Sequence, residues 1–435
     1  MVRWWRSASR PRIESKEPPT NNFYKNEAVP LKQAQFSTQN GQVKNCACLS
    51  YELERWHCVH LSRAGMKATM NYIMTRQHFF SVIIAISFVL LALTPAIAAP
   101  TPPLSPLGPD ARNPSIVVSA GGAVHVVWEQ NDGIWHSVRE TDDWSEPVQI
   151  VAVGQEPTLS IAPMGEIVYL AWSQVFDGNF EVFTSRWSGH SWSESQNVSS
   201  NDGGSATPTF AISSNGGVHL LWSDTSPGSS TIYHAQSSDG LTWPTALPIS
   251  AAVGANPTAA FAADGVLHLA WQHRTNFSER IRIWYSNYDE DWSVPAPLTD
   301  GSQHALAPQL AAGPADLALT WQQGDVVVFA SWQGSSFQPD LIEDGQQPVL
   351  ALAQNHFTYW AWERQTNLGA RFRYAGWSDP ITWAQTAPES GDIALASYGD
   401  QIHFVWAEQT GDGWRIFYDA TTLGNSFAPF ILSAQ

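Results

Sequence analysis

The sequence predicts an all-β fold, a seven-bladed β-propeller of four-stranded blades over residues 112–435, preceded by an export segment. One repeat and one apolar run support this prediction. A short apolar strand that ends in tryptophan recurs 41 to 50 residues apart, which is the length of one propeller blade. An apolar run of about 15 residues, interrupted only by Ser81 and Ser87, lies upstream of the first repeat. The repeated tryptophans are Trp128, Trp172, Trp222, Trp271, Trp321, Trp362 and Trp406.

The chain begins with an extension, residues 1–69, that shows no clean periodicity. We expect it to be disordered or to precede a mis-assigned start codon. Residues 70–99 are typical of a secretory signal peptide, with Arg76 before the apolar run and small residues at Ala96–Ala99 after it. An uncleaved signal anchor is the alternative, in which residues 79–99 would be the only part of the chain in the membrane. Both interpretations place the propeller outside the cytoplasm, secreted or at the cell surface.

Proline-rich residues 100–111 are expected to form a linker, and the repeats begin at residue 112. Each repeat contains a first strand, the strand with the repeated tryptophan, a polar loop, a third strand, a turn closed by an aromatic residue, and a short fourth strand. A proline precedes the repeated tryptophan by 13 to 15 residues in six repeats: Pro114, Pro157, Pro208, Pro257, Pro308 and Pro348. Seven complete repeats predict a ring that closes without borrowing a strand. A solenoid is less consistent, because no polar capping repeat is present at either end.

The turn from Ser237 to Trp243 reads Ser-Ser-Asp-Gly-Leu-Thr-Trp. It resembles the Asp-box of the sialidase-like propellers, also called the bacterial neuraminidase repeat, and is one residue shorter than the motif of that family. The resemblance implies a turn whose Asp and Ser side chains bind the hairpin backbone, on the face opposite the active site. It therefore supports the fold more than any activity.

Charge and cysteine content exclude several partners. Residues 100–435 contain 10 arginines, no lysine and 34 acidic residues, so nucleic acid and anionic membrane surfaces are not expected to bind the propeller. All three cysteines lie before residue 59, which leaves the propeller without thiolate ligands. Four histidines stand three residues before a repeated tryptophan: His125, His219, His268 and His403. Equivalent positions in neighbouring blades lie too far apart to share a metal ion, so we expect buried, hydrogen-bonded histidines, no metal and no cofactor.

The loops between the second and third strands share one face of a propeller with the loops between blades. We expect this face to bind a ligand, because it carries most of the arginines and several carboxylates. Ordinary surface ion pairs are the alternative explanation. The candidates are Arg274, Arg280, Arg364, Arg371, Arg415, Glu129, Asp224, Glu363 and Glu408.

The leading hypothesis is a propeller that binds a glycan, or a cell-surface or envelope protein, without catalysis. The rival is a sialidase-like exo-glycosidase, since Arg112-Asn113-Pro114 is similar to the Arg-Ile-Pro motif of sialidases. That rival requires Arg112 and two of the loop arginines to converge on one pocket. A third hypothesis, a purely structural platform, predicts an apolar patch on the rim.

Overall fold

A computed structural model of the chain describes residues 48–51, 55–61, 67–72, 103–106, 110–141, 143–162, 165–364, 367–385 and 390–422. The chain divides into two units, residues 1–94 and 95–435. The first unit contains a three-stranded antiparallel sheet of β1 (Cys48–Tyr51), β2 (Arg55–Leu61) and β3 (Lys67–Tyr72). The expected apolar run and its cleavage site lie outside the described residues. Among the residues that are described, no helix has the length and apolar content to span a membrane.

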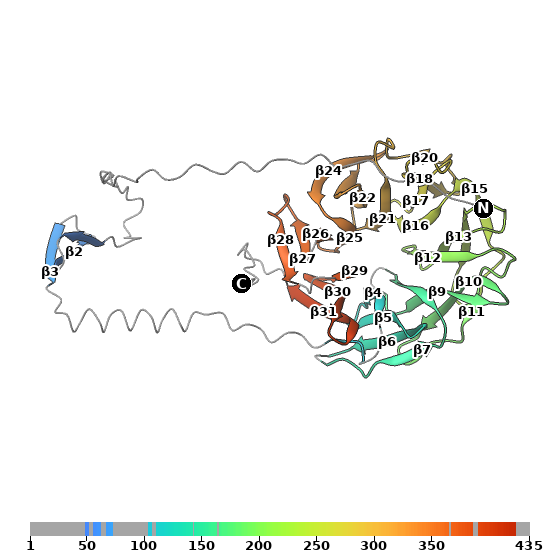
Figure 1. Cartoon of the computed structure of the whole chain (residues 1–435), viewed down its shortest axis with the longest axis horizontal. Helices are drawn as coiled ribbons and strands as arrows, with labels where there is room; N and C mark the ends of the chain where they lie inside the picture. Colours follow the sequence, from blue (N-terminus) through green and yellow to red (C-terminus); the bar gives the residue numbers. More distant parts are fainter. Residues whose placement is uncertain are drawn as a thin grey trace, which may run out of the picture. The chain divides into compact units, whose positions relative to one another are not determined.

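The second unit is a ring of seven antiparallel sheets, which confirms the predicted seven-bladed propeller (Figure 1). Each repeated tryptophan lies on the second strand of its blade. Blades 1 to 3 are β4 (Arg112–Val118), β5 (Val124–Gln130), β6 (Gly133–Arg139) and β7 (Val148–Val151); β8 (Gln155–Ile161), β9 (Val168–Phe176), β10 (Asn179–Trp187) and β11 (Gln196–Asn197); and β12 (Ser205–Ile212), β13 (Val218–Asp224), β14 (Thr231–Ser237) and β15 (Leu247–Val253).

Blades 4 and 7 depart from the regular four-stranded pattern. In blade 4, β18 pairs with both β19 and β20, and in blade 7 the described strands number three. Blades 4 to 7 are β16 (Ala255–Phe261), β17 (Leu267–His273), β18 (Arg282–Asp289), β19 (Asp291–Trp292) and β20 (Ala296–Pro297); β21 (Ala305–Ala312), β22 (Leu317–Gln323), β23 (Val326–Trp332) and β24 (Phe337–Asp344); β25 (Gln346–Leu352), β26 (Thr358–Arg364), β27 (Asn367–Arg373) and β28 (Ile381–Gln385); and β29 (Ser390–Tyr398), β30 (Gln401–Thr410) and β31 (Gly413–Thr422).

The hydrophobic core is divided among the interfaces between blades. There are seven buried clusters in the described part of the ring, and each joins a pair of neighbouring blades. The repeated tryptophans supply the largest side chains and are at most 6% exposed. Both faces of every sheet are therefore buried, which explains why the strands are apolar on both faces rather than alternating.

Part of the predicted linker packs against blade 7. From the sequence, we had expected the ring to close without a strand borrowed from the other end of the chain. The Leu104 amide donates to the Ile416 carbonyl (2.6 Å), and the Ile416 amide donates to Ser105 Oγ (3.0 Å). Leu104 joins the core cluster between blades 7 and 1, and Ser105 is 1% exposed. Arg415 bonds both the hydroxyl and the carbonyl of Ser105. This contact covers the outer edge of β31, which would otherwise expose unpaired backbone groups.

The histidines of the second strands are buried and bonded within their own blades, as expected. His125 Nδ1 lies 3.1 Å from His136 Nε2, and His219 Nδ1 lies 2.9 Å from His234 Nε2. His268 and His403 bond the hydroxyls of tyrosines on the third strands. Burial lowers the pKa of His125 to about 4, so this ring is neutral at pH 7.

Candidate functional site

The innermost strand of every blade contains a β-bulge at the same place. The register of its pairing with the second strand shifts there, and one residue in each bulge has a positive φ of 47° to 55°. In blades 1 to 6 this residue immediately precedes the repeated proline, where an extended backbone is the usual conformation. Strained backbone of this kind persists only where its surroundings enforce it, and it is frequent at functional sites. The seven bulge residues are Asn113, Glu156, Thr207, Asn256, Ala307, Gln347 and Asp392.

The amides of five bulge residues donate to side chains from the preceding blade. The residue after a repeated tryptophan is the usual acceptor: Glu129 for the amide of Glu156, Ser223 Oγ for Asn256 (3.1 Å), and Gln322 Oε1 for Gln347 (3.3 Å). These bonds link adjacent blades and fix the bulges around the ring axis.

Two blades use a different acceptor. In blade 7 the residue after the tryptophan is Ala407, which has no acceptor, and the Asp392 carboxylate instead accepts from the Asn113 amide (3.3 Å). Glu156 Oε2 accepts from the Thr207 amide (2.9 Å) and from Ser173 Oγ (3.3 Å). Glu156 and Asp392 are therefore both bulge residues and acceptors for the next bulge.

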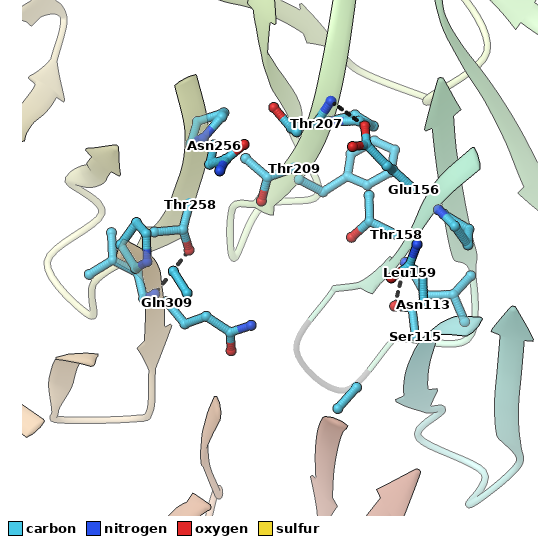
Figure 2. Close-up of a pocket in the computed structure, with 18 of the residues that line it drawn as sticks. Asn113, Ser115, Glu156, Thr158, Leu159, Thr207, Thr209, Asn256, Thr258 and Gln309 are labelled. Carbon is cyan, nitrogen blue, oxygen red and sulfur yellow. Dashed lines mark hydrogen bonds between the residues drawn. The ribbon is translucent and has the colours of Figure 1, made fainter. Parts of the chain in front are cut away.

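All seven bulge residues line the central cavity of the ring, which has a volume of about 630 Å³. Deeper in the cavity the inner strands present hydroxyl groups, and Figure 2 shows these side chains around the open centre. Ser115 Oγ accepts from the Leu159 amide and Thr258 Oγ1 from the Leu310 amide, both at 2.9 Å. The bulges lie at the ends of the inner strands that meet the second-to-third loops, so they form the mouth of the cavity on the predicted ligand face.

Carboxyl groups are concentrated on one side of this mouth. Glu129 Oε1 accepts from Asn113 Nδ2 (2.9 Å) as well as from the Glu156 amide. Arg112 Nε lies 3.2 Å from Asp392 Oδ2, and its guanidinium carbon lies 3.7 Å from the centroid of the Trp414 ring. The single cation of this group is thus paired with a carboxylate and stacked on an aromatic ring.

Glu363 is the most buried of these carboxyl groups, at 4% exposure. Burial, together with the negative charge of Asp392, raises its pKa to about 7, against the opposing effects of bonds from the Gln346 side chain and the Asp392 backbone and of the charge of Arg112. Burial also raises the pKa of Glu129, and its bond from Asn113 opposes this shift.

A second cavity of about 630 Å³ lies between blades 1 and 2. Arg112, Glu129 and Gln155 line it, and Val153 and Phe180 add exposed apolar surface. Arg112 and Glu129 also bond residues of the bulges, Asp392 and Asn113.

Of the nine predicted ligand residues, Glu129 bonds the bulge residues Asn113 and Glu156 and lines the second cavity, and Glu363 is buried; neither is among the residues that line the central cavity. Arg274, Arg280 and Arg364 are exposed on the predicted face, and Arg274 is stacked over Phe277 at 4.5 Å. Arg371 lies within β27 rather than in a loop, and its Nε donates to Glu343 of blade 5 (2.7 Å). Arg415 is buried against Ser105.

Asp224 and Glu408, also predicted as ligand residues, each bond a repeated tryptophan of their own blade. Each stands two residues after a repeated tryptophan and accepts from its indole Nε1 at 3.1 Å. Gln130, Gln174 and Gln323 do the same in other blades. Asp224 is fully buried; burial alone would raise its pKa, but bonds from Ser226, Asn201 and Ser205 hold it below the usual value.

Most residues of the mouth were missed from the sequence, because the repeated prolines were interpreted only as scaffold. The signal was the residue before each proline, which is polar in five of six blades. Within the described part of the chain, no group of three or more His, Cys, Asp or Glu side chains has a geometry suited to a metal ion.

Comparisons with known proteins support the fold. No protein-family model matches the chain, and no curated protein matches it in sequence. Among solved structures, a polysaccharide lyase of family PL25, an ulvan lyase bound to -[GlcA(1-4)Rha3S]-, has a TM-score of 0.53 at 9% identity, covering 74% of this chain and 96% of its own. A Trypanosoma rangeli sialidase has a TM-score of 0.44 at 10% identity, covering 63% of this chain and 54% of its own. A Fusarium graminearum α-L-arabinofuranosidase has a TM-score of 0.44 at 12% identity, covering 74% and 96%. At these identities the similarity shows the β-propeller fold alone.

Proposed function

We propose that this propeller binds a hydroxyl-rich glycan at the mouth of its central cavity, without itself transforming it. The observation that carries the proposal is the ring of seven bulges, which presents amide, hydroxyl and carboxylate side chains around one opening. Such groups donate to and accept from sugar hydroxyls in turn. The cavity volume of about 630 Å³ is within the range of small-ligand sites.

The bulge geometry also favours binding by preorganisation. Because the bulge amides are bonded to the neighbouring blade, their side chains start from fixed backbone positions, and less conformational entropy is lost when a ligand binds. Asn256 and Gln347 are exposed at the mouth, and their side chains have no hydrogen bond to the rest of the described chain. The side-chain amides of Asn256 and Gln347 are therefore available to form hydrogen bonds with a sugar.

The arrangement of the arginines favours a binding protein over the sialidase-like rival. Arg371 is bonded to Glu343, and Arg112 is paired with Asp392. These two residues therefore do not form a cluster of unpaired guanidinium groups that could bind one sugar carboxylate. The apolar run in residues 79–99 leads us to propose that the propeller is exported and binds its glycan outside the cytoplasm. The solved ulvan lyase is a propeller that binds a saccharide, and the analogy with this chain is one of fold alone.

The test is a glycan array probed with residues 100–435, followed by calorimetry on a glycan that binds. We expect Asn256→Gly with Gln347→Gly to weaken binding about tenfold, from the loss of one or two hydrogen bonds. Glycine is chosen because both positions have positive φ. Gln338→Gly, on an exposed outer strand, is the control. Absence of any array signal, or turnover of a fluorogenic glycoside by the same protein, would refute the proposal.

A further inference from the structure

The central cavity has the same depth in every blade. Its lining begins at the bulge residue of each inner strand and ends at the third residue after it, for example from Asn113 to Ile116. At about 3.3 Å per residue, these three steps make the cavity roughly 10 Å deep. The residues at its lower end are all apolar, so the polar part of the cavity lies between them and the mouth. They are Ile116, Leu159, Phe210, Ala259, Leu310, Leu350 and Leu395.

The wall of the central cavity is closed at each junction between blades. Five junctions are linked by a bulge amide that donates to a side chain of the preceding blade. Between blades 4 and 5 the Thr258 hydroxyl accepts from the Leu310 amide, and between blades 6 and 7 Glu363 accepts from the Asp392 backbone. Neighbouring blades are thus bonded to each other around the whole ring. A ligand therefore enters this cavity along the ring axis and not between two blades.

A second layer of polar side chains lies two residues below the bulges, in blades 1 to 5. Two of its hydroxyl groups, those of Ser115 and Thr258, accept from amides of the next blade. The hydroxyls of Thr158 and Thr209 and the side-chain amide of Gln309 have no hydrogen bond to any residue that the structure describes. Figure 2 shows these three groups directed toward the open centre. They are therefore available to a ligand that reaches below the mouth.

We propose that the central cavity binds the free end of an uncharged glycan chain, which enters along the ring axis. This inference deepens the glycan-binding function proposed above and rests on it. The terminal sugar bonds Thr158, Thr209 and Gln309 in the second layer, and the sugar next to it bonds Asn256 and Gln347 at the mouth. Hydroxyl and amide groups both donate and accept, as sugar hydroxyls do. Two layers roughly 6 Å apart therefore contact successive sugars of one chain.

The closed wall favours a chain end over the interior of a chain. An interior sugar has a neighbour on each side, so an unbranched chain that lies across the mouth reaches only the bulge layer. The charges favour an uncharged sugar over an acidic one. Arg112 is paired with Asp392, and the 34 acidic residues among residues 100–435 repel anionic ligands. Interior and acidic sugars are therefore outcomes of the test.

The experiment measures calorimetric binding of residues 100–435 to the linear hexaoses of the malto, cello, manno, xylo and laminari series. Each hexaose is also prepared with a bulky group on its reducing end and, separately, on its non-reducing end. We expect at least one hexaose to bind, and one of its two end-blocked forms to bind at least about tenfold more weakly. Its trisaccharide should bind within about twofold of the hexaose, because each chain has one end of the required kind.

Equal binding of the free hexaose and both blocked forms would show that the chain interior is recognised. It would overturn the inference and leave the proposed function standing. So would an array on which only acidic or amino glycans bind while none of the hexaoses does. If no hexaose and no array glycan binds, both proposals fail.

Variants of the second layer test how far the ligand enters. Thr158→Val and Thr209→Val keep the shape of the side chain and remove its hydroxyl, so each should weaken hexaose binding about threefold to tenfold. Thr141→Val makes the same change at an exposed turn residue outside the cavity and should bind as wild type does. Unchanged binding by both second-layer variants, with weakened binding when Asn256 and Gln347 are replaced, would place the ligand at the mouth alone and overturn the inference.

Discussion

Replacing Glu363 with glutamine tests the electrostatics of the mouth directly. The carboxyl group is 4% exposed, and its pKa is raised from 4.5 to about 7. Glutamine has the same shape as the protonated acid and is neutral at every pH. It can still accept from Gln346 Nε2, which lies 3.4 Å from Glu363 Oε2.

The direction in which the free energy of unfolding changes with pH follows from proton binding. Between pH 4.5 and pH 7 the unfolded chain releases the proton of Glu363 while the folded protein keeps it, so the free energy of unfolding falls as pH rises. At about 1.4 kcal/mol per pKa unit, the loss amounts to about 3 kcal/mol and is complete above pH 7. The glutamine variant lacks this loss. Relative to wild type it should therefore become more stable by about 3 kcal/mol as pH rises through this window.

Urea unfolding of both proteins, followed by tryptophan fluorescence from about pH 4.5 to about pH 8, measures this difference. Taking the difference at each pH cancels the contributions of other titrating groups, including the histidines. Glu146→Gln, which removes the same charge from an exposed position, is the matched control. A flat difference for Glu363→Gln would show that the carboxylate is already ionised in the folded protein, and the reasoning would be wrong.

Three further predictions concern the scaffold. Acid should destabilise the propeller from about pH 6.5 down to pH 4, because the unfolded chain binds protons that buried His125 (pKa about 4) and His136 (pKa about 3) do not bind in the folded protein. His125→Phe with His136→Phe should make the fall in unfolding free energy less steep, with the remainder due to buried His219, His234 and His403; an unchanged slope would contradict this prediction. Leu104→Ala should lower the free energy of unfolding in urea by about 2–3 kcal/mol, as for other core leucines. No change would show that the contact of Leu104 with the core between blades 7 and 1 does not help to close the ring. Arg364→Gln should stabilise the protein by about 1 kcal/mol, because it supplies the acceptor that buried Trp362 Nε1 lacks; a loss of stability would refute this.

The sequence determined the architecture of this protein. Blade number, strand order and the tryptophans of the core follow from a repeat of 41 to 50 residues, because each blade must bury the same apolar surface against its neighbours. The buried histidines could be predicted for the same reason, since a position that recurs in every blade has the same environment in each. A repeat in the sequence therefore predicts the features that the blades have in common.

Only the tertiary structure decided what happens where the blades meet at the axis. The polar residue before each repeated proline is visible in the sequence, but its positive φ is not, because acceptors from the preceding blade hold its amide, as Glu129 does for Glu156. The same holds for Arg415, whose sequence position suggested a ligand and whose partner, Ser105, is 310 residues away. These contacts depend on closing the ring, so the site at the mouth emerges only when residues from all seven blades are brought to one axis.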